Sequence, residues 1–402
     1  MEHPLTNFEL TIEKLVYGGD GLGRADGRVV FTPYVLPGER VMVEPASIKG
    51  GLMRATVLRV IEPSDARVEP ACPYFGRCGG CHLQHSGYAQ QLEAKISILR
   101  ETLRRVGKIE GPAEIAVIAG EPWGYRNRSQ FHIEGGAVGY LEAQSHRLCP
   151  VEQCPISSPR VNAALGALIG MTKDSRWPRF VRGIEVFASE TETQINVLES
   201  ERPVAKRFFE WLAEAMPGFT PGPLEYPAGG YAYRVGGESF FQVNRYLIEA
   251  LVAAGIGEAS GGWALDLYAG VGLFSLPLAR RFARVTAVES GGSAVRDLQW
   301  NVQRAGARIE VAQAAALDYL KKLEAAPDFV LADPPRTGLG KGVVERLAQL
   351  KPAAITIVAC DPATLARDLP GLLGAGYGIR RITMMDLFPQ TFHIETVVEL
   401  GI

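Results

Sequence analysis

A single cysteine, Cys360, ends an apolar run at residues 355–359 and is followed directly by Asp361 and Pro362. A thiol is a strong nucleophile, and at the carboxyl end of a strand in an open α/β sheet it faces the crevice where ligands bind. A lone cysteine is more often a small buried apolar residue. The other reactive residue types at neighbouring strand ends favour a nucleophile here.

Glu395 opens a strand-like segment behind an aromatic stretch that contains Phe388, Phe392 and His393. A carboxylate in such surroundings is partly desolvated and poised to accept a proton. Taken alone, Glu395 would be a surface residue and His393 a surface or packing residue. The interpretation of Glu395 as a base therefore depends on the rest of the pattern.

A glycine-rich turn with Gly270 and Gly272 follows the strand-like run that contains Asp266, and Glu289 ends the next run. Glycine lets a backbone approach a ligand closely, and a carboxylate at the second strand end can accept both hydroxyls of a ribose. The third glycine of a pyrophosphate fingerprint and the lysine of a P-loop are missing. The pattern resembles that of Rossmann-like S-adenosylmethionine-dependent methyltransferases.

A third strand-like run ends at Asp333, which two prolines follow. The prolines fix the loop and remove backbone donors. In methyltransferases such a loop frames the reactive centre, and a rigid turn with no further role is the alternative.

The other five cysteines form a cluster, Cys72, Cys78 and Cys81, and a pair, Cys149 and Cys154. In a reducing compartment they indicate metal binding or catalysis rather than disulfides. The spacing C-x5-C-x2-C presents three thiolates on one tight loop, and by itself it fits zinc and an iron–sulfur cluster equally well.

The elements that must position these residues fall into three predicted domains, at residues 1–64, 65–235 and 236–402. Short strands with glycine and proline punctuation predict a small five-stranded barrel in the first. Its strands are expected at 8–15, 28–31, 41–44 and 54–61, with a break at 18–23.

The central domain is predicted to be mixed, with a helix from Tyr88 to about Lys108 and several strands. The helix is expected to expose Lys95, Arg100, Arg104 and Arg105, and the strands are expected at 129–133, 137–141, 184–187 and 193–198.

In the third domain, at residues 236–402, continuous apolar runs alternating with helical patterns predict a parallel, doubly wound sheet. Its strands are expected at 263–267, 284–289, 329–333 and 355–359.

The 402 residues are 47% hydrophobic and 21% charged, with a formal net charge of −2, which argues against a globally basic coat for nucleic acid. No apolar stretch is long enough to span a bilayer, and the first residues lack the pattern of a signal peptide. We expect a cytoplasmic, monomeric protein without membrane contact.

Five segments together resemble the RNA uracil-5-methyltransferase family: "SFFQVN", "DLYAGVGLFSLPLA", "ADPPRTGL", "ACDPATLARDL" and "FPQTFHIETVVEL". The resemblance extends over nearly the whole chain. It implies that Cys360 adds to carbon 6 of a uridine, that the enolate takes a methyl group at carbon 5, and that Glu395 removes the carbon-5 proton. It implies an S-adenosylmethionine site at Gln242, Tyr268, Gly270, Gly272, Glu289 and Asp333.

The same resemblance favours a 4Fe–4S cluster, with "VEQCPI" supplying Cys154 as the fourth ligand and Cys149 as its rival. It identifies residues 5–62 as a TRAM domain, a small RNA-binding barrel. Candidate RNA contacts are Lys14, Tyr17, Arg24, Phe31 and Lys49 in the barrel, and Arg126 and Arg128 in the aromatic stretch 123–131.

Ribosomal RNA is the expected substrate, because the bacterial transfer-RNA branch of the family typically lacks both barrel and cluster; transfer RNA is the alternative. An inert iron–sulfur RNA-binding protein and a cytosine-5-methyltransferase are remoter rivals. Two positions depart from the family pattern. Asp361 stands where asparagine is common, which puts a carboxylate beside the thiol, and only Gln313 offers a polar side chain towards the adenine.

Overall fold

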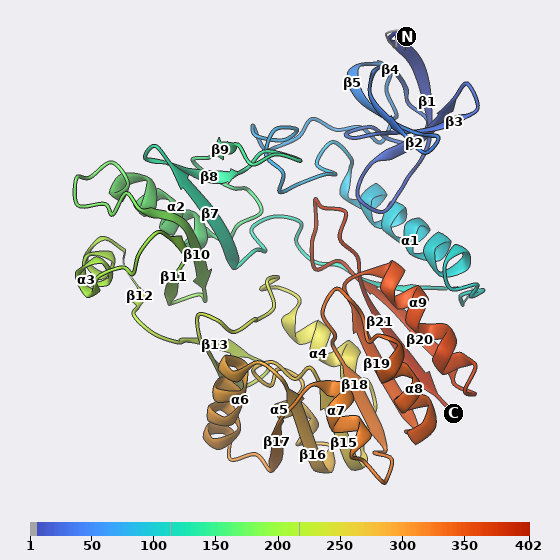
Figure 1. Cartoon of the computed structure of the whole chain (residues 1–402), viewed down its shortest axis with the longest axis vertical. Helices are drawn as coiled ribbons and strands as arrows, with labels where there is room; N and C mark the ends of the chain where they lie inside the picture. The colour runs from blue at the N-terminus through green and yellow to red at the C-terminus, as the bar shows by residue number, and fades with distance from the viewer. Residues whose placement is uncertain (1–5, 113, 217) are drawn as a thin grey trace.

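A computed structural model describes residues 6–112, 114–216 and 218–402, so residues 1–5 of the predicted first domain lie outside the described residues. The chain runs from a barrel at the N-terminus through a central sheet to a larger C-terminal sheet (Figure 1). The three parts meet around the carboxyl ends of the C-terminal strands.

The N-terminal strands form a closed barrel in the order β1-β2-β3-β5-β4, which confirms the predicted barrel. They are Phe8–Leu15 (β1), Gly21–Ala25 (β2), Arg28–Thr32 (β3), Arg40–Lys49 (β4) and Leu52–Glu62 (β5). The break expected at 18–23 is partly wrong, because β2 contains Gly21 and Gly23. A Cβ atom at Gly21 would lie 2.4 Å from Val35, and one at Gly23 would lie 2.5 Å from the Thr11 carbonyl. These glycines are needed for close packing.

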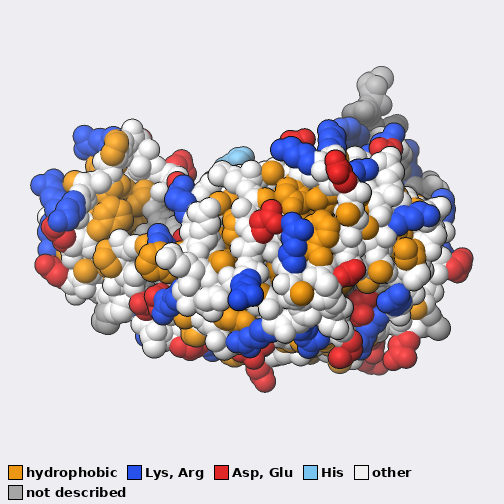
Figure 2. Space-filling view, turned by 90° about the horizontal axis from the view of Figure 1, so that it is seen from below, with side chains coloured by type: hydrophobic (Ala, Val, Ile, Leu, Met, Phe, Trp, Pro, Cys, Tyr) orange, Lys and Arg blue, Asp and Glu red, His pale blue; other side chains and the backbone are white. Residues whose placement is uncertain are grey.

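The central sheet has the order β12-β11-β10-β7-β8-β9 and carries two helices. Its strands are Arg128–Glu134 (β7), Ala137–Leu141 (β8), Leu148–Pro150 (β9), Val181–Ala188 (β10), Thr193–Ser200 (β11) and Phe219–Thr220 (β12). The helices are Pro159–Met171 (α2) and Lys206–Ala215 (α3). In Figure 2, an apolar area bordered by Lys and Arg side chains lies on the lobe that carries them.

The C-terminal sheet has the order β17-β16-β15-β18-β19-β21-β20-β6, and the parallel pairing of β17, β16, β15, β18 and β19 confirms the doubly wound prediction. The strands are Ala116–Ile118 (β6), Gly261–Leu267 (β15), Phe282–Glu289 (β16), Ile309–Gln313 (β17), Phe329–Ala332 (β18), Ala354–Ala359 (β19), Gly378–Met385 (β20) and Glu395–Gly401 (β21). The helices are Ile248–Ile256 (α4), Ser275–Leu278 (α5), Gly292–Ala305 (α6), Ala316–Lys321 (α7), Lys341–Leu350 (α8) and Pro362–Leu373 (α9).

Apolar side chains cover both faces of this sheet, as expected for strands without alternation. In β19, Ile355 and Ile357 belong to the core under α8 and α9, whereas Val358 belongs to the core on the opposite face. The sheet is therefore a rigid central layer, and its carboxyl edge is a fixed platform for side chains.

Segments from the predicted central domain also pack on the C-terminal sheet. The helix Tyr88–Arg105 (α1) lies beside α9, and β6 pairs in parallel with β20 at the sheet edge. A hairpin of Leu224–Ala228 (β13) and Tyr231–Val235 (β14) packs against α6. These contacts tie the predicted central domain to the C-terminal sheet.

The prediction of an exposed Lys95 on α1 is wrong. Lys95 is 1% exposed, and its ammonium lies 2.6 Å from the Asp386 carboxylate and 3.0 Å from the Phe388 carbonyl oxygen. The buried face of α1 therefore includes a charged side chain as well as apolar ones. Lys95 instead anchors the segment that leads to Glu395.

Within residues 6–112, 114–216 and 218–402, no helix is both long and apolar enough to cross a membrane.

Candidate active site and cysteine pocket

Strand pairing brings Cys360, Glu395 and Asp333 to one edge of the C-terminal sheet. Ala359 at the end of β19 pairs with Thr396 of the antiparallel β21, so the next residues on that register, Cys360 and Glu395, face each other. Asp333 follows β18, the other neighbour of β19. A nucleophile and two carboxyls thus come together from three adjacent strands.

Burial raises the pKa of all three groups, and negative neighbours add to this effect at Cys360 and Glu395. Burial, followed by the charges of Glu395 and Asp333, raises the pKa of the Cys360 thiol to about 12. Burial also raises the pKa of Asp333 to about 7 and that of Glu395 well above its ordinary value. The free site therefore favours the thiol form of Cys360 and disfavours the ionised form of Glu395.

Arg336 is a residue of this site to which the sequence pattern assigned no role. Its positive charge opposes the rise in the pKa of both Cys360 and Glu395. The signal was present, because Arg336 directly follows the two prolines after Asp333. It is the cation placed to favour ionisation at the reactive edge.

Replacing Arg336 by Gln is therefore expected to raise the pKa of Cys360 and slow its alkylation several-fold at pH 8, since the thiolate is the reactive form. The rate of modification by iodoacetamide would be followed on the Cys360 peptide by mass spectrometry. In the unchanged protein this rate should rise about tenfold per pH unit between 7 and 9. Arg308→Gln, at an exposed arginine before β17, is the matched control, and equal rates in both variants would contradict the role of Arg336.

Asp361, the departure beside the thiol, caps α9. Its carboxylate accepts hydrogen bonds from the backbone N–H groups of Ala363 and Thr364, both at 2.9 Å. Asparagine and aspartate are equally good at this position of a helix, which accounts for either residue being present. The negative charge adds to the raised pKa of Cys360, as expected.

The glycine-rich turn after β15 forms a cradle at the same edge of the sheet. Tyr268 has a φ of 63°, uncommon for a bulky residue, and Gly270 and Gly272 have φ of 55° and 96°. A Cβ at Gly270 would meet nothing within 4 Å, which leaves open space above the turn. The Glu289 carboxylate at the end of β16 accepts the N–H of Gly270 at 2.9 Å and that of Gly291 at 2.7 Å.

Asp266 lies beneath this turn and was missed as a site residue. It is fully buried, one oxygen accepts the Ser275 hydroxyl, and the other, Oδ1, has no hydrogen-bond partner among the described residues. Burial raises the pKa of Asp266 to about 7. The available signal was its position at the start of the Asp-X-X-X-Gly-X-Gly pattern.

The two remaining cofactor candidates flank the cradle differently. Gln242 is buried in the segment before α4, and its carbonyl oxygen accepts the Asn127 amide at 3.0 Å. Gln313 is exposed at the end of β17, where its Cα pairs with that of Glu289. Of the two glutamines, only Gln313 lies on a strand that pairs with the strand of Glu289.

The barrel reaches the reactive edge through the turn after β1. The Tyr17 hydroxyl lies 3.5 Å from the Cys360 carbonyl oxygen, and its ring packs edge-on against Phe392 at 5.4 Å. A groove of about 760 Å³, the barrel groove, runs from Tyr17 and Phe392 to Arg54 and His132. The barrel and the central sheet thus form the walls beside Cys360.

Several candidate RNA contacts have structural partners. Lys14 pairs with Glu101 of α1 at 2.5 Å, and Arg24 pairs with Glu13. Phe31 is partly exposed and Lys49 is exposed. Arg126 donates to the Arg128 carbonyl oxygen at 2.8 Å. The interpretation of Arg128 as a phosphate contact is wrong, because it is buried and ion-paired with Glu185 at 2.7 Å.

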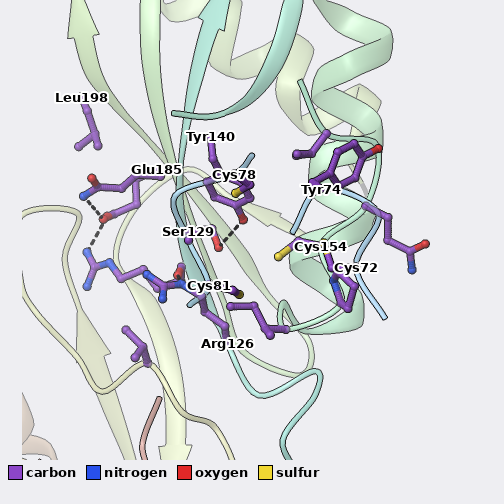
Figure 3. Close-up of a pocket in the computed structure, with 18 of the residues that line it drawn as sticks. Cys72, Tyr74, Cys78, Cys81, Arg126, Ser129, Tyr140, Cys154, Glu185 and Leu198 are labelled. Atoms are coloured by element: carbon purple, nitrogen blue, oxygen red, sulfur yellow. Dashed lines mark hydrogen bonds and ion pairs between the residues drawn. The ribbon is translucent and has the colours of Figure 1, made fainter. Parts of the chain in front are cut away.

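Four cysteines line one cavity of about 620 Å³, the cysteine pocket: Cys72, Cys78, Cys81 and Cys154 (Figure 3). Asn162 fixes the turn at Cys154, since its side chain accepts the Cys154 N–H at 2.8 Å and donates to the Cys154 carbonyl at 3.0 Å. Cys149 does not line the cavity and is fully buried in the core around β9.

Comparisons with known proteins agree with this geometry. The tRNA (uracil-5-)-methyltransferase family matches residues 224–401, and the TRAM domain matches residues 6–57. A protein of Halomonas elongata named 23S rRNA (uracil(1939)-C(5))-methyltransferase RlmD is 34% identical over 98% of this chain and 89% of its own length. An RNA methyltransferase of Aquifex aeolicus is 31% identical over 98% of both chains. This chain belongs to the RNA uracil-5-methyltransferase family.

A solved structure of this family extends the match to the whole fold. The Pyrococcus abyssi tRNA (uracil-54, C5)-methyltransferase, in complex with S-adenosyl-L-homocysteine, is 26% identical and has a TM-score of 0.78. The alignment covers 98% of this chain and 100% of that one. The barrel, central sheet and C-terminal sheet are therefore an arrangement found elsewhere among uracil-5-methyltransferases.

Proposed function

We propose that this chain transfers a methyl group from S-adenosylmethionine to carbon 5 of a uridine in RNA. The observation that carries the proposal is the meeting of Cys360, Glu395 and Asp333 beside the glycine-rich cradle, in a chain of this family. The residues of the cradle fit an adenosyl ligand, since Gly270 leaves open space, Glu289 offers a carboxylate to ribose hydroxyls, and Asp266 Oδ1 has no partner among the residues that the structure describes.

The proposed roles follow from the chemistry of uracil. Carbon 5 is a poor nucleophile until the Cys360 thiol loses its proton to solvent and its sulfur bonds to carbon 6, which gives carbon 5 enolate character. S-adenosylmethionine, when bound, supplies an electrophilic methyl group and a positive charge. Glu395 then removes the carbon-5 proton, the carbon 5–carbon 6 double bond re-forms, and the bond to Cys360 breaks.

The raised pKa values fit an order of events. Burial favours the protonated form of Glu395 in the free site. A positive charge near Asp333 and Glu395 would favour their ionised forms. We infer that Glu395 is a better base in the assembled complex than in the free site.

The cofactor contacts lead to one prediction. Glu289→Gln is expected to weaken binding of S-adenosylhomocysteine about tenfold or more, because a hydrogen bond to a charged group contributes about 1.5–3 kcal/mol. Isothermal titration calorimetry without RNA would measure the dissociation constant of S-adenosylhomocysteine. Glu310→Gln, at an exposed glutamate on the neighbouring β17, is the control, and equal affinities would contradict the role of Glu289.

Ribosomal RNA is the proposed substrate and transfer RNA the second candidate. The barrel and cysteine-bearing domain do not discriminate between them, because the Pyrococcus abyssi transfer-RNA enzyme matches this chain over its whole length. The preference rests on sequence identity, which is 34% to the 23S rRNA enzyme of Halomonas elongata and 26% to the transfer-RNA enzyme.

The deciding experiment is an anaerobic reaction of the purified protein with S-adenosylmethionine and separate unmodified 23S rRNA and transfer RNA. Nucleoside and fragment mass spectrometry would identify 5-methyluridine and locate it. Methylation of ribosomal RNA is expected. Methylation of transfer RNA alone would reverse the substrate, and no methylation of either, with cofactor bound, would overturn the activity.

We further propose that the cysteine pocket holds a 4Fe–4S cluster. Four thiols line one cavity, which suits a cluster that binds each thiolate through a separate iron. The family resemblance favours this cluster over zinc, and the burial of Cys149 outside the cavity supports Cys154 as the fourth ligand.

Cysteine substitutions test the cluster directly. Anaerobically reconstituted protein is expected to contain about four iron and four sulfide per chain, with visible charge-transfer absorption. Cys154→Ser should lose most of both, and Cys149→Ser should retain them. Bound zinc without sulfide, or loss only in Cys149→Ser, would contradict the assignment.

A further inference from the structure

A separate cavity of about 970 Å³ lies on the central domain between residues 175–182, 201–207 and α3. Its lining combines arginine with aromatic side chains. We name it the arginine groove, after Arg176, Arg179, Arg182, Arg202, Arg207 and Trp211. It belongs to the lobe on which Figure 2 shows an apolar area bordered by Lys and Arg side chains.

The arginine groove retains uncompensated positive charge. Glu201, Glu210 and Glu214 also line it, but Glu201 pairs with Arg182 at 3.2 Å and Glu210 with Lys206 at 3.4 Å. Arg176 pairs with Asp174 at 2.8 Å. Arg179, Arg202 and Arg207 have no carboxylate partner among the residues the structure describes, and all three are exposed. Such guanidinium groups are suited to phosphate oxygens.

Two of these guanidinium groups lie over aromatic rings. Arg202 lies over the Phe180 ring at 4.3 Å, and Arg176 lies over the Trp211 ring at 4.5 Å. Trp177 also lines the cavity, but it is 5% exposed and its indole N–H is buried. The guanidinium groups and aromatic rings together match the phosphates and unstacked bases of a single strand.

Several cavities of the central domain share lining residues between the arginine groove and the barrel groove. The arginine groove shares Val204 with a neighbouring cavity of about 640 Å³, which in turn shares Leu198 and Glu238 with the cysteine pocket. The cysteine pocket, which is proposed above to hold a cluster, shares Gln130 and Tyr140 with the barrel groove, whose residue Tyr17 lies 3.5 Å from the Cys360 carbonyl oxygen. Hollows thus follow one another along the surface of the central domain.

We propose that the arginine groove is a second RNA-binding site, which holds a single-stranded segment of the substrate outside the part that carries the target uridine. The proposal rests on the proposed function in that RNA is the substrate. The groove binds phosphates through Arg179 and Arg207, and it stacks bases beside Arg202 and Trp211. It adds affinity for long RNA without touching the reacting atoms.

The test measures fluorescence anisotropy of a labelled 20-nucleotide oligouridine with the full chain over a range of salt concentrations. Arg179→Glu/Arg207→Glu is expected to weaken binding at least tenfold. The slope of log K against log salt should fall by about 1.4, since each phosphate contact on a single strand contributes about 0.7. Methylation of a short hairpin with the target uridine should keep its kcat.

Arg308→Glu/Arg381→Glu, which changes two exposed arginines at the amino edge of the C-terminal sheet, is the matched control. Arg179→Gln/Arg207→Gln, with thermal melting of each variant, separates charge reversal from misfolding. Unchanged affinity and slope in the groove variants, or an equal loss in the control, would overturn the proposal and leave a protein partner for this surface. Because binding is measured without turnover, the result is independent of whether any RNA is methylated.

Discussion

Replacing Glu395 by Gln is expected to trap the protein on its RNA. Cys360 can still bond to carbon 6 and the methyl group can still be transferred, but the carbon-5 proton then has no base to accept it. The covalent adduct should persist on a denaturing gel and contain one methyl group per RNA. Turnover should fall by about 10²–10⁴-fold, as for the loss of a general base.

Two further variants make this result specific. Cys360→Ala should form no adduct and should lose turnover by about 10⁴-fold or more, as when a catalytic nucleophile is removed. Glu399→Gln, four residues further along β21, should turn over normally. An adduct in Cys360→Ala, or rapid turnover in Glu395→Gln, would refute the assigned roles.

Lys95→Met is expected to destabilise the folded protein by about 3–5 kcal/mol, because it leaves the fully buried Asp386 carboxylate without its cation. Denaturant unfolding monitored by fluorescence would measure the loss. The same ammonium holds the Phe388 carbonyl, so residual folded protein should also show a lower kcat. Lys95→Met/Asp386→Leu should recover much of the stability, because no charge is then left buried.

Lys14→Met provides the control for that experiment. Lys14 of β1 pairs with Glu101 of α1, the helix that also carries Lys95, but the Lys14 and Glu101 side chains are 36% and 22% exposed. Such a pair contributes about 0–1 kcal/mol. Equal losses of unfolding free energy in Lys14→Met and Lys95→Met would show that the buried ion pair contributes no more stability than the exposed one.

The contrast between these lysines indicates what the sequence could and could not predict. Apolar spacing located α1 and the strands that end at Cys360 and Glu289, because periodicity reports burial of apolar side chains. It placed Lys95 in solvent, since its partner Asp386 is 291 residues away in the sequence. Arg128 was misassigned for the same reason, with Glu185 57 residues away. Pairings of buried charges are properties of the tertiary fold.

The sequence also predicted only part of the candidate site. Its nucleophile, base and glycine-rich turn were recognisable as short motifs, each at a strand end. Arg336 and Asp266 lay inside those motifs without an assigned role, because their importance comes from groups that only the fold brings near them. Likewise, the pairing of β19 with β21 is needed to bring residues 35 positions apart, Cys360 and Glu395, face to face.

The pairing of β6 with β20 also means that the C-terminal sheet is not an independent folding unit. The eighth strand of the C-terminal sheet, together with α1, comes from the part of the chain before residue 120. A fragment containing residues 236–402 alone would leave the edge of β20 without its partner and would uncover the apolar surface beneath α1. Unprotected edges of this kind recruit strands from other molecules. Recombination or truncation at this apparent boundary would therefore yield an aggregation-prone unit, so the catalytic half and its upstream segments are constrained to be inherited together.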